Sequence, residues 1–280
     1  MPTWICRACG TQYPDTDAPP SACPICEDPR QPVPPSGQAW TTPDELGRGH
    51  DATIRVLERD REGEPLLVGI GSTPSFAIGQ RALLIRGPRG NVLWDCQPLL
   101  DATIRLAVES LGGIDVIAIS HPHYYSNMVD WAHAFGARIL LHQGDREWVM
   151  RPDPVVEHWP GETLELPQGP VLIRGGGHFY GGTVLHWQEG AEGRGALLTG
   201  DILSVLPDQR LVSFMYSYPM LLPLPGTEVR RLLAAIDSLA FDRIYGAWWE
   251  RVIPSGAKAA VEESGRRYLE ALAGHLPIKG

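Results

Sequence analysis

The 280-residue sequence lacks three features that would each indicate a broad class of protein. Its 24 lysines and arginines are outnumbered by 33 aspartates and glutamates and form no basic cluster, so we do not expect it to bind nucleic acid. No apolar run approaches the roughly 18 residues of a membrane-spanning helix, and the first residues lack the basic and apolar regions of a secretion signal. We therefore expect a cytoplasmic protein that does not enter a membrane.

Cysteine is also scarce, and its distribution argues against a disulfide framework. The chain has five cysteines, an odd number, of which Cys96 stands apart from the other four. Clustered cysteine pairs in a reducing compartment are more typical of a metal site than of disulfides. Cys6 and Cys9 form one C-x-x-C turn, and Cys23 and Cys26 form another. Two such turns predict one tetrahedral site with four sulfur ligands, although free thiols or two disulfides remain the alternative.

The segment that carries these four cysteines is predicted to be a small module of its own. Residues 1–45 are rich in proline and lack periodic hydrophobicity, so they need a metal to stabilise them, and residues 46–280 form the main domain. The sequences CGTQY from Cys9 and CP from Cys23 resemble the knuckles of rubredoxin, with a shorter loop between them and Glu27 in place of a glycine. Sulfur ligands suit zinc or iron, and we favour structural zinc in a rubredoxin-like zinc ribbon.

Strand and helix patterns alternate through the rest of the chain and predict a mixed α/β architecture. Asp145 is expected to cap a short helix that contains Trp148. The other expected elements are a hairpin over 81–95, helices over 99–111, 128–135, 228–238 and 257–272, and strands over 114–119, 138–141, 171–174, 183–187, 196–199 and 242–245.

A histidine-rich segment follows the predicted buried strand at 114–119. His121 and His123 stand two residues apart, so both imidazoles can point into one cleft. His178 follows three glycines between two predicted strands, and Asp201 follows the strand at 196–199. Loops at strand ends are where α/β proteins place their chemistry. Each residue alone is more typical of a surface histidine or a capping aspartate, but their order along the chain indicates a site.

That order resembles the metallo-β-lactamase fold superfamily. Its members carry an H-x-H-x-D-H motif after a strand, a histidine in a G-H loop, an aspartate after a later strand and a last histidine. His121 and His123 match the start of the motif, His178 matches the loop, Asp201 matches the bridging carboxylate, and Asp95 matches the aspartate of an early strand. The resemblance covers most of the main domain and implies an αββα sandwich.

Three positions depart from the family pattern. Tyr125 and Ser126 occupy the places of the aspartate and histidine of the second metal position. The region of the last histidine contains Trp248 and Trp249, and an indole nitrogen can only donate a hydrogen bond. We therefore predict a single zinc ion held by the three histidines, with Asp201 on or near it, rather than a binuclear centre.

Three histidines with an open position are typical of a catalytic zinc, which activates water and polarises carbonyl groups. The resemblance thus implies a hydrolase that acts on an ester, lactone, thioester or amide. Asp201 would orient the water or act as general base, and Tyr125 would either donate to an oxyanion or pack as an ordinary aromatic residue. Ser126 is expected to cap the following helix. Trp248 and Trp249 favour an apolar or aromatic small-molecule substrate.

Two other classes of function stay open on these residues. One is a redox protein with a rubredoxin-like iron centre, and the other is a non-catalytic metal-binding protein of the same fold. On these residues the N-terminal module can either pack on the main domain or recruit a protein partner, whose identity stays open.

Overall fold

The structure is a computed structural model that describes residues 2–276, and its chain divides into two compact units. The first unit comprises Met1–Pro160 and Pro167–Gly169, and the second comprises Gly161–Leu166 and Pro170–Gly280. The first unit holds the four clustered cysteines together with the strands that follow them. The domain boundary that we place at residues 45 and 46 stays a prediction.

The N-terminal part of the first unit is built around the cysteines. Its small antiparallel sheet has the order β2-β1-β3. Tyr13 and Ile25 pack with the four thiols, and Trp4 and Trp40 cover them. These elements are β1 (Trp4–Cys6), β2 (Gln12–Tyr13), α1 (Pro24–Glu27) and β3 (Trp40–Thr41), followed by α2 (Pro43–Gly49). The buried core of this part consists of the four cysteines and these few neighbours, with the cysteines at its centre.

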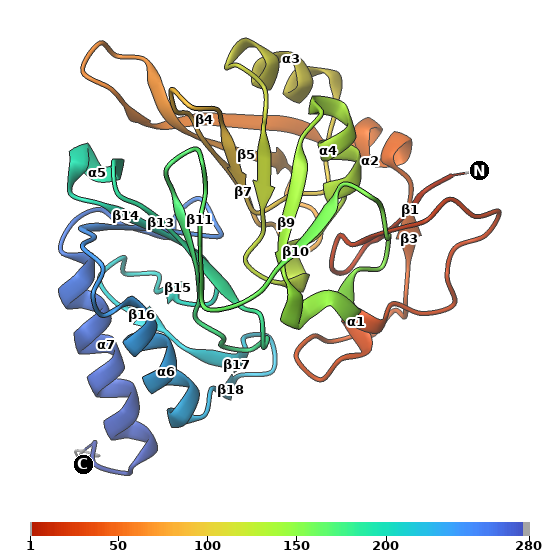
Figure 1. The fold of residues 1–280 in the computed structure, drawn as a ribbon. Helices are drawn as coiled ribbons and strands as arrows, with labels where there is room; N and C mark the ends of the chain where they lie inside the picture. The colour runs from red at the N-terminus through yellow and green to blue at the C-terminus, as the bar shows by residue number, and fades with distance from the viewer. Residues whose placement is uncertain (1, 277–280) are drawn as a thin grey trace. The chain divides into compact units, whose positions relative to one another are not determined.

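The rest of the first unit is a mixed sheet in the order β10-β9-β8-β7-β6-β5-β4 (Figure 1). β4 to β7 pair in antiparallel fashion, whereas β7 to β10 are parallel. Parallel strands buried on both faces require continuous apolar runs, which is the pattern of β7 and β8. The strands are β4 (Asp51–Arg59), β5 (Pro65–Thr73), β6 (Ala82–Ile85), β7 (Val92–Trp94), β8 (Val116–Ala118), β9 (Arg138–His142) and β10 (Val156–Trp159).

Short helices connect the parallel strands, and local signals fix their ends. α3 (Ala102–Ser110) begins where the Asp101 carboxylate accepts a hydrogen bond from the Ile104 amide, at 2.8 Å. α4 (Met128–Phe135) ends at Gly136, whose φ of 67° is the left-handed conformation that glycine adopts at helix ends. Two 3₁₀ turns, η1 (Pro122–Tyr124) and η2 (Gln143–Trp148), follow β8 and β9. The parallel strands thus share one edge at which loops emerge from their carboxyl ends.

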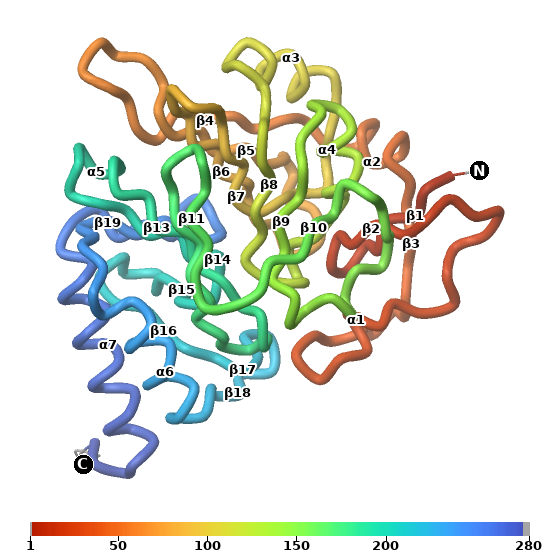
Figure 2. The backbone as a smooth tube through the Cα atoms, viewed as in Figure 1, coloured from red at the N-terminus to blue at the C-terminus, as the bar shows by residue number. Residues whose placement is uncertain are grey.

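The second unit is a mixed sheet in the order β11-β12-β13-β14-β19-β20, covered by α6 and α7 (Figure 2). The two helices approach closely at Gly265, where an added Cβ would lie 2.5 Å from Leu233 Cδ1. The strands of this sheet are β11 (Thr163–Glu165), β12 (Val171–Arg174), β13 (Thr183–Trp187), β14 (Ala196–Gly200), β19 (Arg243–Gly246) and β20 (Val252–Ile253). Two separate pairs are formed by β15 (Ser204–Val205) with β16 (Val212–Ser213) and by β17 (Met215–Ser217) with β18 (Leu222–Pro223). The helices are α5 (Gly190–Gly193), α6 (Gly226–Ile236) and α7 (Ala257–Leu272).

Most of the elements expected from the sequence occur in the structure, and the hairpin, α4, α7, β12 and β13 lie at the expected residues. Asp145 lies within η2 at a kink, with a φ of −114° and a ψ of 19°, just before the turn that contains Trp148, so its expected role as a cap stays a prediction. The first turn of η2 is capped by His142, whose Nδ1 accepts a hydrogen bond from the Gly144 amide at 3.1 Å. Across residues 2–276, no helix combines the length and the apolar character needed to cross a membrane.

Candidate metal centres

The four clustered cysteines converge in the first unit. Cys6 ends β1 and Cys9 lies in the turn after it, while Cys23 precedes α1 and Cys26 lies within α1. All four side chains are buried, and their sulfur atoms lie within 4.8 Å of one another. The Cys6–Cys26 and Cys9–Cys23 sulfur pairs are each 3.6 Å apart.

These sulfur distances fit a shared metal ion and not a disulfide. A tetrahedral ion with metal–sulfur bonds of about 2.3 Å has sulfur–sulfur edges of about 3.8 Å, whereas a disulfide bond is about 2.05 Å long. The sulfurs also accept hydrogen bonds from neutral donors, as metal-bound thiolates do. The Gln38 amide donates to Cys6 Sγ and the Tyr13 hydroxyl donates to Cys23 Sγ, both at 3.1 Å. Burial, and then the charge of Cys23, raises the pKa of Tyr13, so its hydroxyl stays a donor. The predicted cysteine cluster is therefore confirmed as a site able to hold a metal.

His121 and His123 lie in the first unit at the carboxyl end of β8, on either side of Pro122. Both side chains are buried, and their ring centroids are 5.0 Å apart at an interplanar angle of 78°. The Ser120 hydroxyl lies 2.9 Å from His121 Nδ1. Asp95 Oδ1 accepts a hydrogen bond from the Ser120 amide at 2.8 Å, so this carboxylate holds the backbone just before His121. Asp95 is the residue that the sequence analysis matched to the early aspartate of the family. Its role in this structure is to hold the backbone of the loop that carries His121 and His123.

Tyr125 and Ser126 follow the histidines and are both buried. Burial, and then the charge of Asp145, raises the pKa of Tyr125 well above its ordinary value, so the phenol stays protonated at neutral pH. The expectation that Ser126 caps the next helix is wrong, because the residue before α4 is Asn127. Ser126 instead has a φ of 45°, and its hydroxyl accepts a hydrogen bond from the Gln80 amide at 2.9 Å.

His178 lies in the second unit, in the loop between β12 and β13. Glycine is required at two places in this loop, because a Cβ on Gly182 would lie 2.0 Å from the Gly176 carbonyl oxygen, and Gly176 itself has a φ of 71°. Asp201 follows β14 in the same unit. Its Oδ1 lies 3.6 Å from His178 Nε2, and both side chains are buried. The predicted histidine and aspartate of this half therefore lie close together.

Tyr218 holds Asp201 in place, and the sequence did not single it out for this role. Its hydroxyl donates to the main-chain carbonyl of Asp201 at 2.9 Å and lies 3.1 Å from that of Ser213. Its ring lies 6.2 Å from that of His178, centroid to centroid. Burial, and then the charge of Asp201, raises the pKa of Tyr218, which keeps the hydroxyl a donor. No spacing or neighbouring residue marks this tyrosine, because the contact depends on how the chain returns after β16.

Replacing Tyr218 by phenylalanine is expected to lower the free energy of unfolding by about 1–3 kcal/mol, because the substitution removes a buried donor and leaves its acceptors behind. The matched control is Tyr180→Phe, since Tyr180 is 70% exposed and should change stability by less than about 0.5 kcal/mol. Urea unfolding followed by circular dichroism measures both values. Equal stability of the two variants would contradict the role given to the Tyr218 hydroxyl.

A tight turn connects β19 and β20, in the region where the family pattern would place its last histidine. Ala247 donates its amide to the Gly200 carbonyl at 3.0 Å, so this turn lies beside the residue that precedes Asp201. Trp248 and Trp249 occupy the turn and are half-buried. The two indoles thus lie on the same edge of the second sheet as Asp201.

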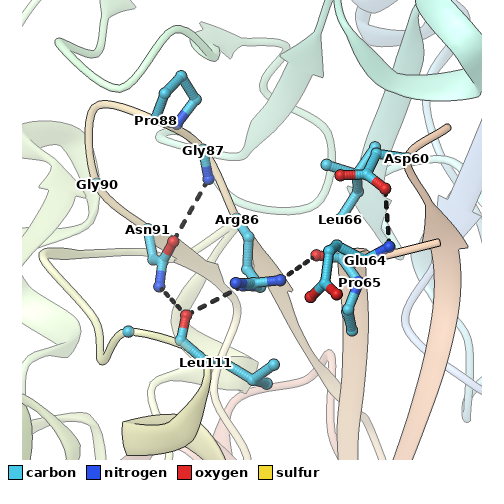
Figure 3. Close-up of a pocket in the computed structure, with 11 residues that line it drawn as sticks. Asp60, Glu64, Pro65, Leu66, Arg86, Gly87, Pro88, Gly90, Asn91 and Leu111 are labelled. Carbon is cyan, nitrogen blue, oxygen red and sulfur yellow. Dashed lines mark hydrogen bonds between the residues drawn. The ribbon is translucent and has the colours of Figure 1, made fainter. Parts of the chain in front are cut away.

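A pocket of about 490 Å³ lies elsewhere in the first unit, beside the start of β7 (Figure 3). His121 follows the opposite, carboxyl end of the parallel strand β8. Arg86 donates to the main-chain carbonyls of Leu111 and Pro65, at 3.0 and 2.6 Å, and Asn91 also donates to Leu111, at 3.0 Å. These bonds tie the end of α3 to the hairpin, so we assign the polar lining a structural role.

Comparison with solved structures identifies the fold as that of the metallo-β-lactamases. The metallo-β-lactamase SMB-1 bound to 2-mercaptoethanesulfonate is 18% identical, with a TM-score of 0.52, over 75% of this chain and 95% of that chain. A B3 metallo-β-lactamase with an active-site glutamic acid is 19% identical, with a TM-score of 0.51, over 75% of this chain and 87% of that chain. No family model matches the sequence.

The chain is 47% identical over 276 residues to the uncharacterized protein YmaE of Bacillus subtilis (strain 168), which covers 99% of both proteins. It therefore belongs to the same family as YmaE. The expected α/β fold of metallo-β-lactamase type, preceded by a four-cysteine segment, is confirmed.

Proposed function

We propose that the protein is a metal-dependent hydrolase with a single zinc ion held by His121, His123 and His178, with Asp201 on or beside it. The observation that carries the proposal is the presence of two buried ligand pairs in a chain of metallo-β-lactamase fold. One pair is His121 and His123 at the end of β8, and the other is His178 and Asp201, 3.6 Å apart. Each pair lies at strand ends, where proteins of this class place their chemistry.

The donor set fits zinc. Imidazole and carboxylate are both common ligands of this ion, and catalytic sites have three protein ligands and one open position. The Ser120 hydroxyl lies beside His121 Nδ1 and orients the ring, as hydrogen-bond partners of metal-binding histidines do. In this arrangement Nε2 would be the nitrogen that binds the metal. A zinc ion bound there supplies Lewis acidity and lowers the pKa of water to about 7.

The chain's own residues would divide the remaining work. Asp201 would accept a hydrogen bond from the attacking water and hold or receive its proton. Tyr125, whose pKa is raised by burial, would donate its hydroxyl proton in a hydrogen bond to the developing oxyanion. His178 Nε2 lies 3.6 Å from Asp201 Oδ1, which is longer than a hydrogen bond, so the two atoms would face the same ion rather than bind each other. Trp248 and Trp249, on the edge of the sheet that bears Asp201, would contact an apolar or aromatic part of a small-molecule substrate.

For the four-cysteine site we propose structural zinc rather than iron. The four sulfurs are buried in the centre of a segment with almost no other core, and such sites contribute folding energy when zinc binds. Thiols kept available for a metal suit a reducing compartment, so we expect the protein in the cytoplasm.

The test combines metal analysis with a substrate panel. Protein purified without added metal is expected to contain about two zinc ions per chain and to hydrolyse at least one class among aryl esters, lactones, thioesters and amides. A mild chelator should abolish turnover, and zinc should restore it. Iron with a rubredoxin-type spectrum would favour the redox function instead, and one zinc per chain without turnover would favour a non-catalytic protein.

A further inference from the structure

The four-cysteine segment contacts the histidine loop directly, within the first unit. The main-chain amide of Gln12 donates to the main-chain carbonyl of Ser126 at 3.0 Å, three residues after His123. The Gln12 side chain donates to Asp130 Oδ2 at 2.6 Å, in α4. Arg151 completes this junction, because its guanidinium contacts the Gln12 side chain and pairs with Asp130 Oδ1 at 2.6 Å. Gln12 itself is buried, while Asp130 and Arg151 are partly exposed.

The accepting residue is held in a conformation that needs support. Ser126 has a φ of 45°, and such left-handed backbone costs a non-glycine residue about 1 kcal/mol or more. Gln80 holds its hydroxyl at 2.9 Å and donates to the Cys96 carbonyl at 3.0 Å, while Gln12 holds its carbonyl. The turn is continuous with the histidines, since the Tyr125 amide donates to the Pro122 carbonyl at 3.3 Å. Loss of the Gln12 contact therefore loosens the loop that carries His121 and His123.

The first cysteine knuckle sets where Gln12 lies. The Cys6 amide donates to the Thr11 carbonyl at 3.0 Å, and the Gly10 amide donates to the Cys6 carbonyl at 2.8 Å, so residues 6–11 close into one turn. Gly10 has a φ of 83°, and a Cβ there would lie 2.7 Å from Pro98 Cγ. The knuckle thus packs against the chain that leads from β7, with no space for a side chain between them. A metal on Cys6 and Cys9 fixes this turn, because both sulfurs then share one ion.

We propose that the four-cysteine module is a brace for the hydrolase loop, in which metal at the thiols positions Gln12 and thereby raises the metal affinity of His121 and His123. The inference rests on the proposed function. Binding at the two sites is then coupled, and by linkage the coupling is reciprocal. Gln12 is a positioning residue, since it acts through Ser126 and Asp130.

The test compares Gln12→Ala with Gln31→Ala. Gln31 belongs to the same module, and its main-chain amide donates to the Asp28 carbonyl within its own turn. Zinc is titrated against a chromophoric chelator after the four-cysteine site is loaded, and hydrogen exchange is followed over residues 121–130. Gln12→Ala removes the side-chain bonds to Asp130 and Arg151 and leaves the main-chain bond to Ser126, so it frees the segment that carries that bond. The variant is expected to keep one zinc on the cysteines, to raise the dissociation constant of the second zinc about tenfold, and to speed exchange of the loop. Gln31→Ala should change neither.

If Gln12→Ala proves unstable, a second pair of variants can be used for the same measurements. Gly10→Ala meets Pro98, whereas Gly37→Ala, at a φ of 87°, has nothing within 4 Å of its added Cβ. Only Gly10→Ala should weaken the binding of the second zinc and speed hydrogen exchange of the loop. Equal dissociation constants and equal exchange within both pairs would overturn the brace. If the wild type binds zinc at the cysteines alone, the proposed function fails, and loop exchange with and without that zinc then decides the brace by itself.

Discussion

Replacing His178 by alanine is expected to lower kcat/KM on the best substrate by a thousandfold or more. Even residues that only support metal ligands contribute about 10–100-fold, so the loss of a ligand should cost more. The substitution also leaves Asp201 without the ring that lies 3.6 Å from its Oδ1. We expect about one zinc ion per chain to be lost, while the four-cysteine site stays loaded.

The matched control is His133→Ala. The His133 side chain is 56% exposed and pairs with Asp153 at 2.9 Å on the surface of the first unit. The His133→Ala variant should keep both zinc ions and wild-type turnover. Its stability should change little, because exposed ion pairs contribute about 0–1 kcal/mol. Metal analysis and steady-state kinetics on the two variants give the answer. Equal turnover by His178→Ala and the wild type would remove the catalytic claim.

Replacing Cys23 by serine is expected to release the metal of the four-cysteine site and to unfold the N-terminal part of the first unit. Zinc contributes about 10–16 kcal/mol of apparent binding energy in small structural sites, which is also folding energy. The same change removes the sulfur that accepts the Tyr13 hydroxyl proton in a hydrogen bond. Trp4 and Trp40, which cover the cluster, should then become exposed, and tryptophan fluorescence reports that change.

Cys96→Ser is the control for this variant. Cys96 is buried away from the cluster, and burial raises the pKa of its thiol, so it is not a thiolate ligand at neutral pH. Its substitution should leave the zinc content unchanged and the fluorescence of the N-terminal tryptophans as in the wild type. Retention of the thiolate-bound metal by Cys23→Ser would disprove a four-sulfur site, and a three-ligand site would have to replace it.

The two predicted clusters differ in how much of them could be derived from the sequence. The cysteine site follows from short spacing, because two residues between thiols already direct both at one ion. The histidine and aspartate candidates follow from strand ends, where the chain must turn and polar side chains collect. His121 and His123 in one unit, and His178 and Asp201 in the other, lie in the buried loops that this reasoning predicts.

What the sequence could not provide are contacts between segments far apart in the chain. Gln12 meets Ser126 and Asp130, and Tyr218 meets Asp201, through docking that no local pattern encodes. The error at Ser126 has the same origin. Serine favours helix starts, but the Ser126 hydroxyl accepts its hydrogen bond from the distant Gln80 side chain instead of capping the next helix.

The glycine pair in the His178 loop restricts how this family can diversify. The Gly176 carbonyl lies against the site of any Cβ on Gly182, and Gly176 itself has a φ of 71°, so a side chain at either position would strain the loop that carries His178. Under the proposed function, changes of substrate preference would therefore have to arise from the more exposed neighbour Tyr180, or from loops on other strands. The loop that carries His178 is fixed at these two glycines, and adaptation is left to its surroundings.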